Sequence, residues 1–365
     1  MKGERRNPAG VSRRRDGSVL IIALWVVVLL SLIVSSFAFD MHVEGRITSY
    51  YRKRLKADYL ARAGIERARM LLVKSLDADI QDEDAYEDRD APWYPNAKRL
   101  SEGSAVHGVT DKLTSGTISV DIVPEPARRN INRLIERPED WEKVMDIAGI
   151  PEEKWDELTD CLHDWIDADD KPRNYGAETE GYYSQQDSPP YKAKNLPLDT
   201  IGELLLVKGF EREMVYGGLP ENAKDGDKAL RGMADLLTTF GDDTVNVNAA
   251  GRTVLMTLPG IDDITADDIV FERERNPPTI GNVLSNVEAG REKYDSSFKD
   301  VNDFYGRFPE LRAKLDKRVT TGSGIYRITS RGESHGVVEE VSCIATVAKT
   351  GKMAILRWAE GEGND

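Results

Sequence analysis

The first long hydrophobic pattern is an uncharged run at residues 18–39. As a helix rising ~1.5 Å per residue, it spans roughly 33 Å, which matches the ~30 Å hydrocarbon core of a bilayer. Arginines precede the run, whereas Asp40 and Glu44 follow it. By the positive-inside rule, we expect a single-pass membrane helix with a cytoplasmic N-terminus and the bulk of the chain across the membrane.

The helical pattern continues beyond the apolar run. Residues 40–75 contain no proline, and apolar or small residues recur at helical spacing with charged residues on the opposite face. Several are small and lie three or four positions apart, which lets another element approach closely: Ala57, Ala61, Gly64 and Ala68. We therefore predict that one long helix leaves the membrane and becomes half-buried in a second domain.

Alternating segments predict strands near both ends of the remaining chain. An acidic stretch at residues 77–90 predicts a solvated loop after the helix. Residues 117–123 alternate apolar and polar positions, which predicts a first strand ended by the prolines that follow. Three later alternating segments predict an antiparallel meander: residues 326–330, 337–347 and 353–358.

Between about residues 130 and 320 the pattern is helical. Two apolar stripes at helical spacing begin at Trp141 and Trp155, and an irregular, proline-rich excursion covers residues 171–197. Further helices are predicted near residues 199–207, 233–239 and 267–275. Residues 245–273 resemble a helix-hairpin-helix or SAM-like unit, a class that often binds DNA. Because Asp262 and Asp263 in its turn would repel phosphate, we predict a packing role and no nucleic-acid partner.

The charge is asymmetric. The net charge is −14, and residues 1–17 carry six basic and two acidic side chains, so the remainder is at −18. Such a polyanion is a poor ligand for DNA or anionic lipid but can attract divalent cations. The two cysteines, Cys161 and Cys343, lie in different predicted domains, so we expect buried free thiols and no disulfide framework.

The basic run SRRRDG before SVLII resembles the N-terminus of type IV pilin-like subunits. In that family a peptidase cuts after the glycine and the new N-terminus is methylated, which implies cleavage between Gly17 and Ser18. The fifth mature position, a glutamate in ordinary pilins, is Ile22 here. A lipid-buried glutamate finds a partner in the N-terminal amine of the subunit above, so a subunit with Ile22 suits a filament end. An ordinary anchor, or a secretory signal ending near Ala38, remains the alternative.

The missing glutamate resembles the K component of type II secretion systems, a minor pseudopilin. Four motifs add to the resemblance: NIN (130–132), DWIDADDKPRNYGAETEGYY (164–183), PPYKAKN with ELLLVKG behind it (189–209), and VNVNAA (245–250). The implied fold class is α+β, a pilin-like fold of long helix and antiparallel sheet interrupted by an all-α domain. The predicted divisions are leader 1–17, membrane helix 18–39, pilin-like parts 40–129 and 321–365, and helical subdomains 130–243 and 244–320.

The resemblance implies a non-enzymatic subunit of the bacterial inner membrane that starts and caps the periplasmic pseudopilus, which drives export of folded proteins. The expected partners are other minor pseudopilins, the inner-membrane secretion platform, a prepilin peptidase and secreted substrates. Three rivals stay open. They are a minor pilin of a type IV pilus, an anchored periplasmic calcium-binding or hydrolytic protein, and, more distantly, a DNA-uptake protein.

An acidic cluster follows the second apolar stripe. Asp164 and several carboxylates within the next positions supply the hard oxygen ligands that Ca²⁺ prefers. An EF-hand is excluded, since Lys171 and Pro172 stand where an oxygen ligand and a glycine belong. The resemblance also implies calcium at this loop; a solvated acidic turn that caps the helix is the alternative. The best candidate ligands are Asp167, Asp169 and Glu178, followed by Asp170, Glu180 and Asp187.

One motif, GESHG at residues 332–336, matches the G-x-S-x-G nucleophile elbow of esterases. The elbow needs a strand before the serine and a helix after it, but strands are predicted on both sides of Ser334. The four histidines are scattered, so no zinc or acid–base constellation is indicated. We therefore predict no catalytic residues.

Overall fold

The computed structural model describes residues 16–77, 80, 90–186, 189–219, 228–275, 297–348 and 350–361. The chain divides into two compact units, Met1–Lys56 and Ala57–Asp365. The first fifteen residues of the predicted leader and most of the acidic stretch at residues 77–90 lie outside the described residues.

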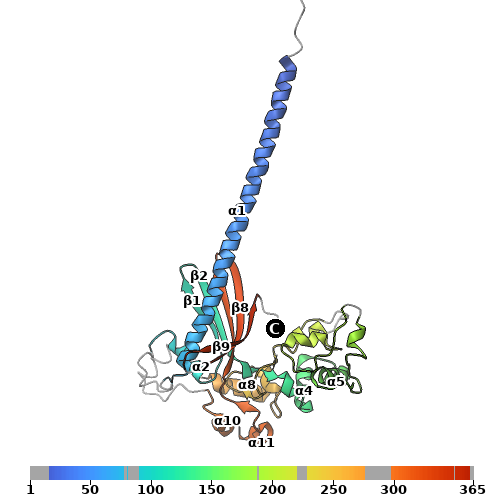
Figure 1. The fold of residues 1–365 in the computed structure, drawn as a ribbon. Coiled ribbons are helices and arrows are strands. Elements are labelled where there is room, and N and C mark those ends of the chain that lie inside the picture. Colours follow the sequence, from blue (N-terminus) through green and yellow to red (C-terminus); the bar gives the residue numbers. More distant parts are fainter. Residues whose placement is uncertain are drawn as a thin grey trace, which may run out of the picture. The chain divides into compact units, whose positions relative to one another are not determined.

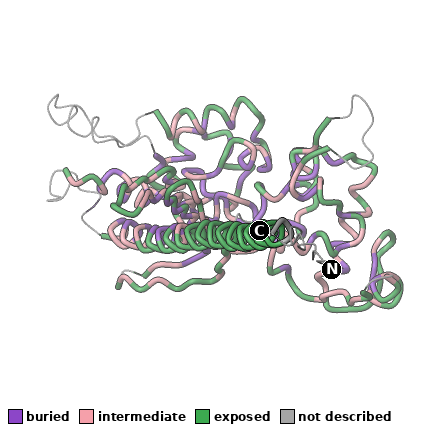
Figure 2. Tube along the Cα trace, turned by 90° about the horizontal axis from the view of Figure 1, so that it is seen from above, coloured by how far each residue is buried: buried purple, intermediate pink, exposed green. Residues whose placement is uncertain are grey.

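The first unit is helical wherever it is described. The helix α1 (Asp16–Ser75) begins here, and residues 19–52 are exposed along their whole length. Figure 2 shows this part of the tube in green, in contrast to the purple segments of the second unit. A helical window of mean hydropathy 2.9, with no residue buried, makes this the one described helix long and apolar enough to cross a membrane. The predicted end of the long helix at residue 75 is confirmed.

The second unit contains a five-stranded antiparallel sheet in the order β1-β2-β7-β8-β9. Its strands are β1 (Val106–Leu113), β2 (Gly116–Pro124), β7 (Ile325–Ser334), β8 (Val337–Val347) and β9 (Met353–Glu360). The three-stranded C-terminal meander is confirmed. The predicted first strand is the second strand of the sheet, because β1 and the preceding helix α2 (Tyr94–Ser101) were not predicted. In β1 only Val106 is buried, so the strand lacks the apolar alternation that would reveal it.

The final turns of α1 pack on one face of this sheet (Figure 1). The predicted small-residue stripe is the contact, since Ala57, Ala61 and Ala68 are fully buried. A Cβ added at Gly64 would lie 1.9 Å from Ser330 Oγ, and one added at Gly332 would lie 2.1 Å from the carbonyl of Ala57. Helix and sheet therefore each present a glycine to the other, and Gly332 of the esterase-like motif has a packing role.

The residues between β2 and β7 form a mostly helical insertion. Its regular α-helices begin with α3 (Ile131–Leu134), α4 (Pro138–Ala148), α5 (Trp155–Ile166) and α6 (Arg212–Tyr216), and continue with α7 (Arg252–Met256), α8 (Asp263–Glu274), α10 (Val301–Arg307) and α11 (Arg312–Leu315). Short 3₁₀ turns lie between them: η2 (Glu125–Ala127), η3 (Glu152–Lys154), η4 (Tyr183–Gln185), η5 (Ile201–Leu206) and η6 (Pro309–Leu311). The strand pairs β3 (Arg129–Asn130) with β4 (Leu237–Thr238) and β5 (Val245–Asn246) with β6 (Val319–Thr320) are parallel.

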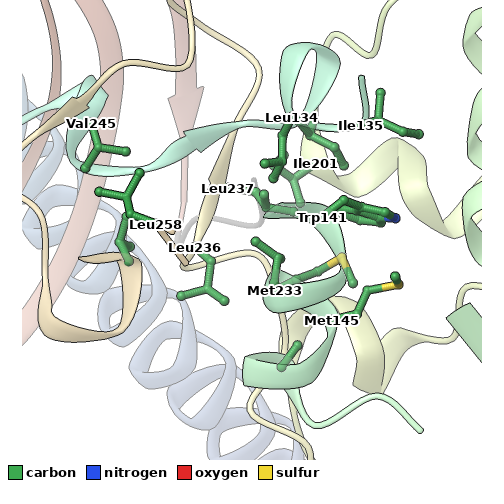
Figure 3. Close-up of a cluster of buried hydrophobic side chains, with 14 of the residues drawn as sticks. Leu134, Ile135, Trp141, Met145, Ile201, Met233, Leu236, Leu237, Val245 and Leu258 are labelled. Atoms are coloured by element: carbon green, nitrogen blue, oxygen red, sulfur yellow. The ribbon is translucent and has the colours of Figure 1, made fainter. Parts of the chain in front are cut away.

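A single apolar cluster runs through the insertion (Figure 3). Trp141 and Met145 of the first predicted stripe and Leu158 and Leu162 of the second are buried in it, so both stripes are confirmed as core. The cluster continues to residues of the α7–α8 hairpin such as Leu258. The two helical subdomains therefore share one core.

The helix predicted at residues 233–239 is wrong. This segment is a turn followed by β4, although Met233, Leu236 and Leu237 are buried as a helical stripe would be. The backbone amide of Arg129 donates to the carbonyl of Leu236 (2.8 Å), so the segment satisfies its backbone by pairing with β3. At residues 199–207 the predicted helix is the 3₁₀ helix η5, and α8 begins earlier than predicted, at Asp263.

The asparagines of two motifs hold distant segments together. Asn132 and Leu198 form two reciprocal hydrogen bonds, side chain to backbone, of 3.0 and 2.8 Å. In VNVNAA, the amide of Asn246 donates to the carbonyl of Gly103 (2.8 Å), and that of Asn248 donates to the carbonyl of Phe298 (2.8 Å). Both motifs therefore have a structural explanation.

A buried ion network joins the two halves of the insertion. Arg129 is fully buried, and its guanidinium donates to Asp243 at 2.8 and 2.9 Å and to Asp140 at 2.9 Å. Arg137 also donates to Asp243 (2.9 Å), and Arg318 contacts Asp140. Burial opposes the charge of Arg129, but the two carboxylates outweigh it and raise its pKa. Nothing in the hydrophobic pattern predicted this network.

Candidate functional site

The predicted processing site lies at the start of α1. Gly17 and Ser18 fall in its first turn, and Ile22 follows with 63% of its surface exposed. No charged residue occurs between Ser18 and Phe39, so the position of the pilin glutamate is apolar and the nearest following acid is Asp40. Cleavage at Gly17 and the role of Ile22 stay predictions.

The acidic loop begins where α5 ends and runs back along that helix. Asp164, fully buried, accepts from the backbone amide of Arg173 (3.1 Å), and Asp160 accepts from that of Tyr175 (3.1 Å). A Cβ added at Gly176 would lie 1.9 Å from Asp164 Oδ2, so only glycine permits this close approach. The loop is thus fixed against α5 by backbone hydrogen bonds to carboxylates.

Glu178 and Asp167 on this loop, and Asn195 on the segment that follows it, hold buried oxygens without hydrogen-bond partners among the described residues. They are both carboxylate oxygens of Glu178, Oδ1 of Asp167 and Oδ1 of Asn195. Glu178 is only 4% exposed. A buried carboxylate with neither oxygen satisfied is costly unless a cation or a proton compensates it.

The surrounding charges strengthen this need. Burial raises the pKa of Glu178 to about 7, with further increases from the nearby charges of Asp164, Asp167 and Asp170. Burial likewise raises the pKa of Asp164. These carboxylates are close enough to repel one another, which is the setting in which a divalent cation binds carboxylate and amide oxygens.

The structure separates the predicted ligands. Glu178 and Asp167 have unpartnered buried oxygens at the loop, whereas Asp169 is exposed and accepts from the amide of Lys171 (2.9 Å). Asp170 accepts from the side chain of Asn195 (3.2 Å), and Glu180 is exposed. Asp187 lies outside the described residues.

Among the described residues, no group of three or more His, Cys, Asp or Glu side chains is placed so that it could hold a metal ion. Sequence reasoning missed Asn195, which brings an amide oxygen to the loop from the PPYKAKN motif. In the structure its backbone is left-handed (φ 51°), a conformation in which asparagine is enriched. Glu178, Asp167 and Asn195 carry buried carboxylate and amide oxygens, which are of the kind that Ca²⁺ prefers.

The other candidate chemistries find no support at the residues concerned. The hydroxyl of Ser334 is buried and donates to the carbonyl of Ser115 (2.9 Å), and the strand β8 follows it. Cys161 and Cys343 are free and buried, as predicted. Asp262 caps α8 by accepting from the amide of Thr265 (2.8 Å), so a carboxylate occupies the hairpin position that phosphate would need.

A known family model matches part of the helical insertion. Residues 127–220 match the family model described as type II secretion system (T2SS), protein K. The chain is 25% identical over 222 residues to the putative type II secretion system protein K of Escherichia coli K12. It is 26% identical over 270 residues to the type II secretion system protein K of Pseudomonas aeruginosa. These matches cover 58% and 68% of this chain and 62% and 66% of the relatives, so the chain spans just under two thirds of the relatives' length.

The fold is also found in a solved structure. A chain of the GspK-GspI-GspJ complex from the type 2 secretion system of enterotoxigenic Escherichia coli superposes with a TM-score of 0.55 at 14% identity. The match covers 88% of this chain and all of that one. At this identity the comparison establishes the α+β fold, with an antiparallel sheet and an N-terminal apolar helix, and nothing finer.

Proposed function

We infer that this chain is a protein K of a type II secretion system and works as a minor pseudopilin. The observation that carries this is the position of the insertion. The segment that matches protein K lies between β2 and β7, which are nevertheless adjacent strands with Pro124 opposite Tyr326. A pilin-like sheet interrupted at this point by a helical domain is a specific architecture, and the solved neighbour shares the fold.

We further propose that the chain occupies the tip of the pseudopilus. Ile22 leaves no acid in the apolar half of α1, so the subunit has no carboxylate that must pair with the N-terminal amine of a subunit above. The helical insertion adds bulk that hinders a second copy beside it. The chain would start and cap a filament together with other minor pseudopilins, of the kind named in the neighbouring complex, and so promote export of folded proteins.

Maturation is tested by the N-terminal mass of the protein extracted from membranes, after expression with and without a prepilin peptidase. We expect a peptidase-dependent start at Ser18 carrying an N-methyl group. An intact Met1, or a start at Phe39, would contradict processing at Gly17 and return the apolar helix to the role of an ordinary anchor or signal.

Assembly is tested by co-expression with the minor pseudopilins and, separately, with the major pilins of the same host. We expect a stable complex with the other minor pseudopilins of a secretion operon. Deletion of this chain should abolish secretion of folded proteins while leaving surface pili intact. Loss of pili with normal secretion would assign the subunit to a type IV pilus instead.

We also propose that the acidic loop binds one Ca²⁺. Glu178, Asp167 and Asn195 would supply side-chain oxygens, and the unpartnered buried oxygens of these residues are the support. Asp170 would hold Asn195 in place through its hydrogen bond, with Asp169 and Glu180 at the exposed rim. The bound ion would compensate the carboxylate charges of Glu178 and Asp167, which form no hydrogen bond or ion pair with the described residues through their buried oxygens.

A further inference from the structure

A pocket of about 560 Å³ lies between α4, α5 and the loop that follows α5. The helices contribute residues at helical spacing, namely Trp141 and Glu142 from α4 and Trp155 and Asp156 from α5. Its size is that of a site for a small ligand or a docked side chain. Asn174 and Tyr175 of the proposed calcium loop line the pocket, but the three oxygen-bearing residues of that loop do not.

The walls are aromatic and rigid. Trp141 is fully buried behind the wall, where its indole donates to Thr159 Oγ1 (3.0 Å), so the accessible aromatic surface comes from the half-buried Trp155 and from Tyr175. The indole of Trp155 donates to the carbonyl of Ile150 (2.9 Å). Both indole N–H groups are thus satisfied, and the rings are held in place. Tyr175, 59% exposed, is part of the lining on the loop side.

The rim of the pocket is acidic, and no basic side chain of the lining balances its charge. The lining includes Glu142, Glu152, Asp156 and Asp160 and no basic side chain. Among the described residues, Glu142, Glu152 and Asp156 form no ion pair within 4 Å. An acid in the first turn of α5 is favoured by the helix dipole, which accounts for Asp156, and Asp160 accepts from the backbone amide of Tyr175. Neither effect explains Glu142, in the second turn of α4.

Aromatic faces together with carboxylates recognise organic cations. A guanidinium is planar, stacks on an indole and forms two parallel hydrogen bonds to a carboxylate, which an ammonium does not do. Exposed carboxylates at the mouth also attract a cationic partner from a distance. We propose that this pocket binds an arginine side chain presented by a segment of another protein. The proposal is independent of the secretion assignment.

The test uses the full chain in detergent micelles, labelled with 5-fluorotryptophan and observed by fluorine NMR at constant Ca²⁺. The chain has six tryptophans, and a Trp155→Phe variant assigns the resonance of the pocket residue. The probe is acetyl-Gly-Arg-Gly-amide, compared with the same peptide carrying citrulline, which keeps the shape and removes the charge. We expect the Trp155 signal to shift saturably with the arginine peptide and much less with citrulline.

A matched pair of variants locates the binding. Glu152→Gln with Asp156→Asn removes two rim charges and should weaken binding roughly 5-fold, the size expected for two partly exposed ion pairs. Glu153→Gln with Asp146→Asn removes the same charge from exposed positions outside the pocket and should leave affinity unchanged. Equal binding of citrulline, equal loss in both variants, or no saturable shift up to the solubility limit would each overturn the proposal. Equal affinity for a lysine peptide would overturn the choice of arginine.

Discussion

Two glycines set how closely α1 packs on the sheet. At Gly64 and Gly332 an added methyl group would overlap backbone or side-chain atoms at about 2 Å, whereas nothing lies within 4 Å of a Cβ at Gly306. We predict that Gly64→Ala and Gly332→Ala each lower the free energy of unfolding by about 1–3 kcal/mol, the usual cost of overpacking. The measurement is urea unfolding followed by circular dichroism.

Gly306→Ala is the matched control, because it makes the same substitution inside the helix α10. It should be neutral or stabilise by up to ~1 kcal/mol through helix propensity. Similar losses at all three positions would show that the glycines matter through backbone freedom and not through close packing.

Glu125 is a buried carboxylate between the sheet and the insertion. It accepts two hydrogen bonds from Arg327 of β7 (2.9 and 3.2 Å) and one from Thr238 of β4. Burial works to raise the pKa of Glu125, but the charge and hydrogen bonds of Arg327 and the charge of Arg128 outweigh it, so the pKa lies below 4.5. The ionised carboxylate of Glu125 therefore stabilises the folded state above pH 4.5. This contribution to the free energy of unfolding is lost as pH falls through the lower folded-state pKa.

We predict that Glu125→Gln lowers the free energy of unfolding by about 3 kcal/mol at pH 7, because a buried ion pair loses one partner. The difference from the unmodified protein should shrink as pH falls below 4.5. Unfolding curves recorded from pH 3 to 7 measure it, and a difference that stays constant with pH would show that the ionised form of Glu125 adds nothing.

At the residue scale the sequence predicted side chains that follow a period and missed those that pair across the fold. The small face of α1 and the stripes headed by Trp141 and Trp155 repeat at helical spacing, so they were visible. The Arg129 network and Asn195 were not, because their partners lie far away in the chain and only folding brings them together.

At the scale of elements, segments with a sustained hydrophobic period were predicted correctly, and segments without one were not. The long helix and the C-terminal strands were predicted because each carries a sustained period of its own. The segment at residues 233–239 failed because three buried side chains suggested a helix, whereas pairing of β4 with β3 fixed the backbone. The edge strand β1, exposed along most of its length, gave no alternation to read.

The loop after α5 offers an element-scale prediction. If it binds Ca²⁺, thermal unfolding in calcium should occur at a higher temperature than in EGTA, because a ligand bound only by the folded state stabilises it by mass action. Glu178→Gln should remove this increase, while Glu153→Gln, an exposed position on η3, should keep it. An identical increase in the Glu178 variant would place the calcium elsewhere or make its effect non-specific.

At the scale of the whole molecule, the sheet and the insertion are separable in principle. Because Pro124 stands opposite Tyr326, a two-residue Asn-Gly turn could join β2 directly to β7. We predict that a chain with residues 125–325 replaced by such a turn still folds. It should unfold cooperatively with lower stability, since contacts such as that between Asn246 and Gly103 are lost. Loss of cooperative unfolding would mean that the sheet depends on the insertion for its structure.

The pairing of Pro124 with Tyr326 also has a kinetic consequence. Closing a flexible loop as long as residues 125–325 carries an entropic cost that grows with the logarithm of its length. Once the insertion has folded, its two ends lie side by side, and the cost of joining β2 to β7 falls to that of a short turn. Because non-local strand pairing is otherwise slow, we expect the central strands to acquire hydrogen-exchange protection after the helices do. The folded insertion thus brings β2 and β7 together and so favours formation of the sheet that it interrupts.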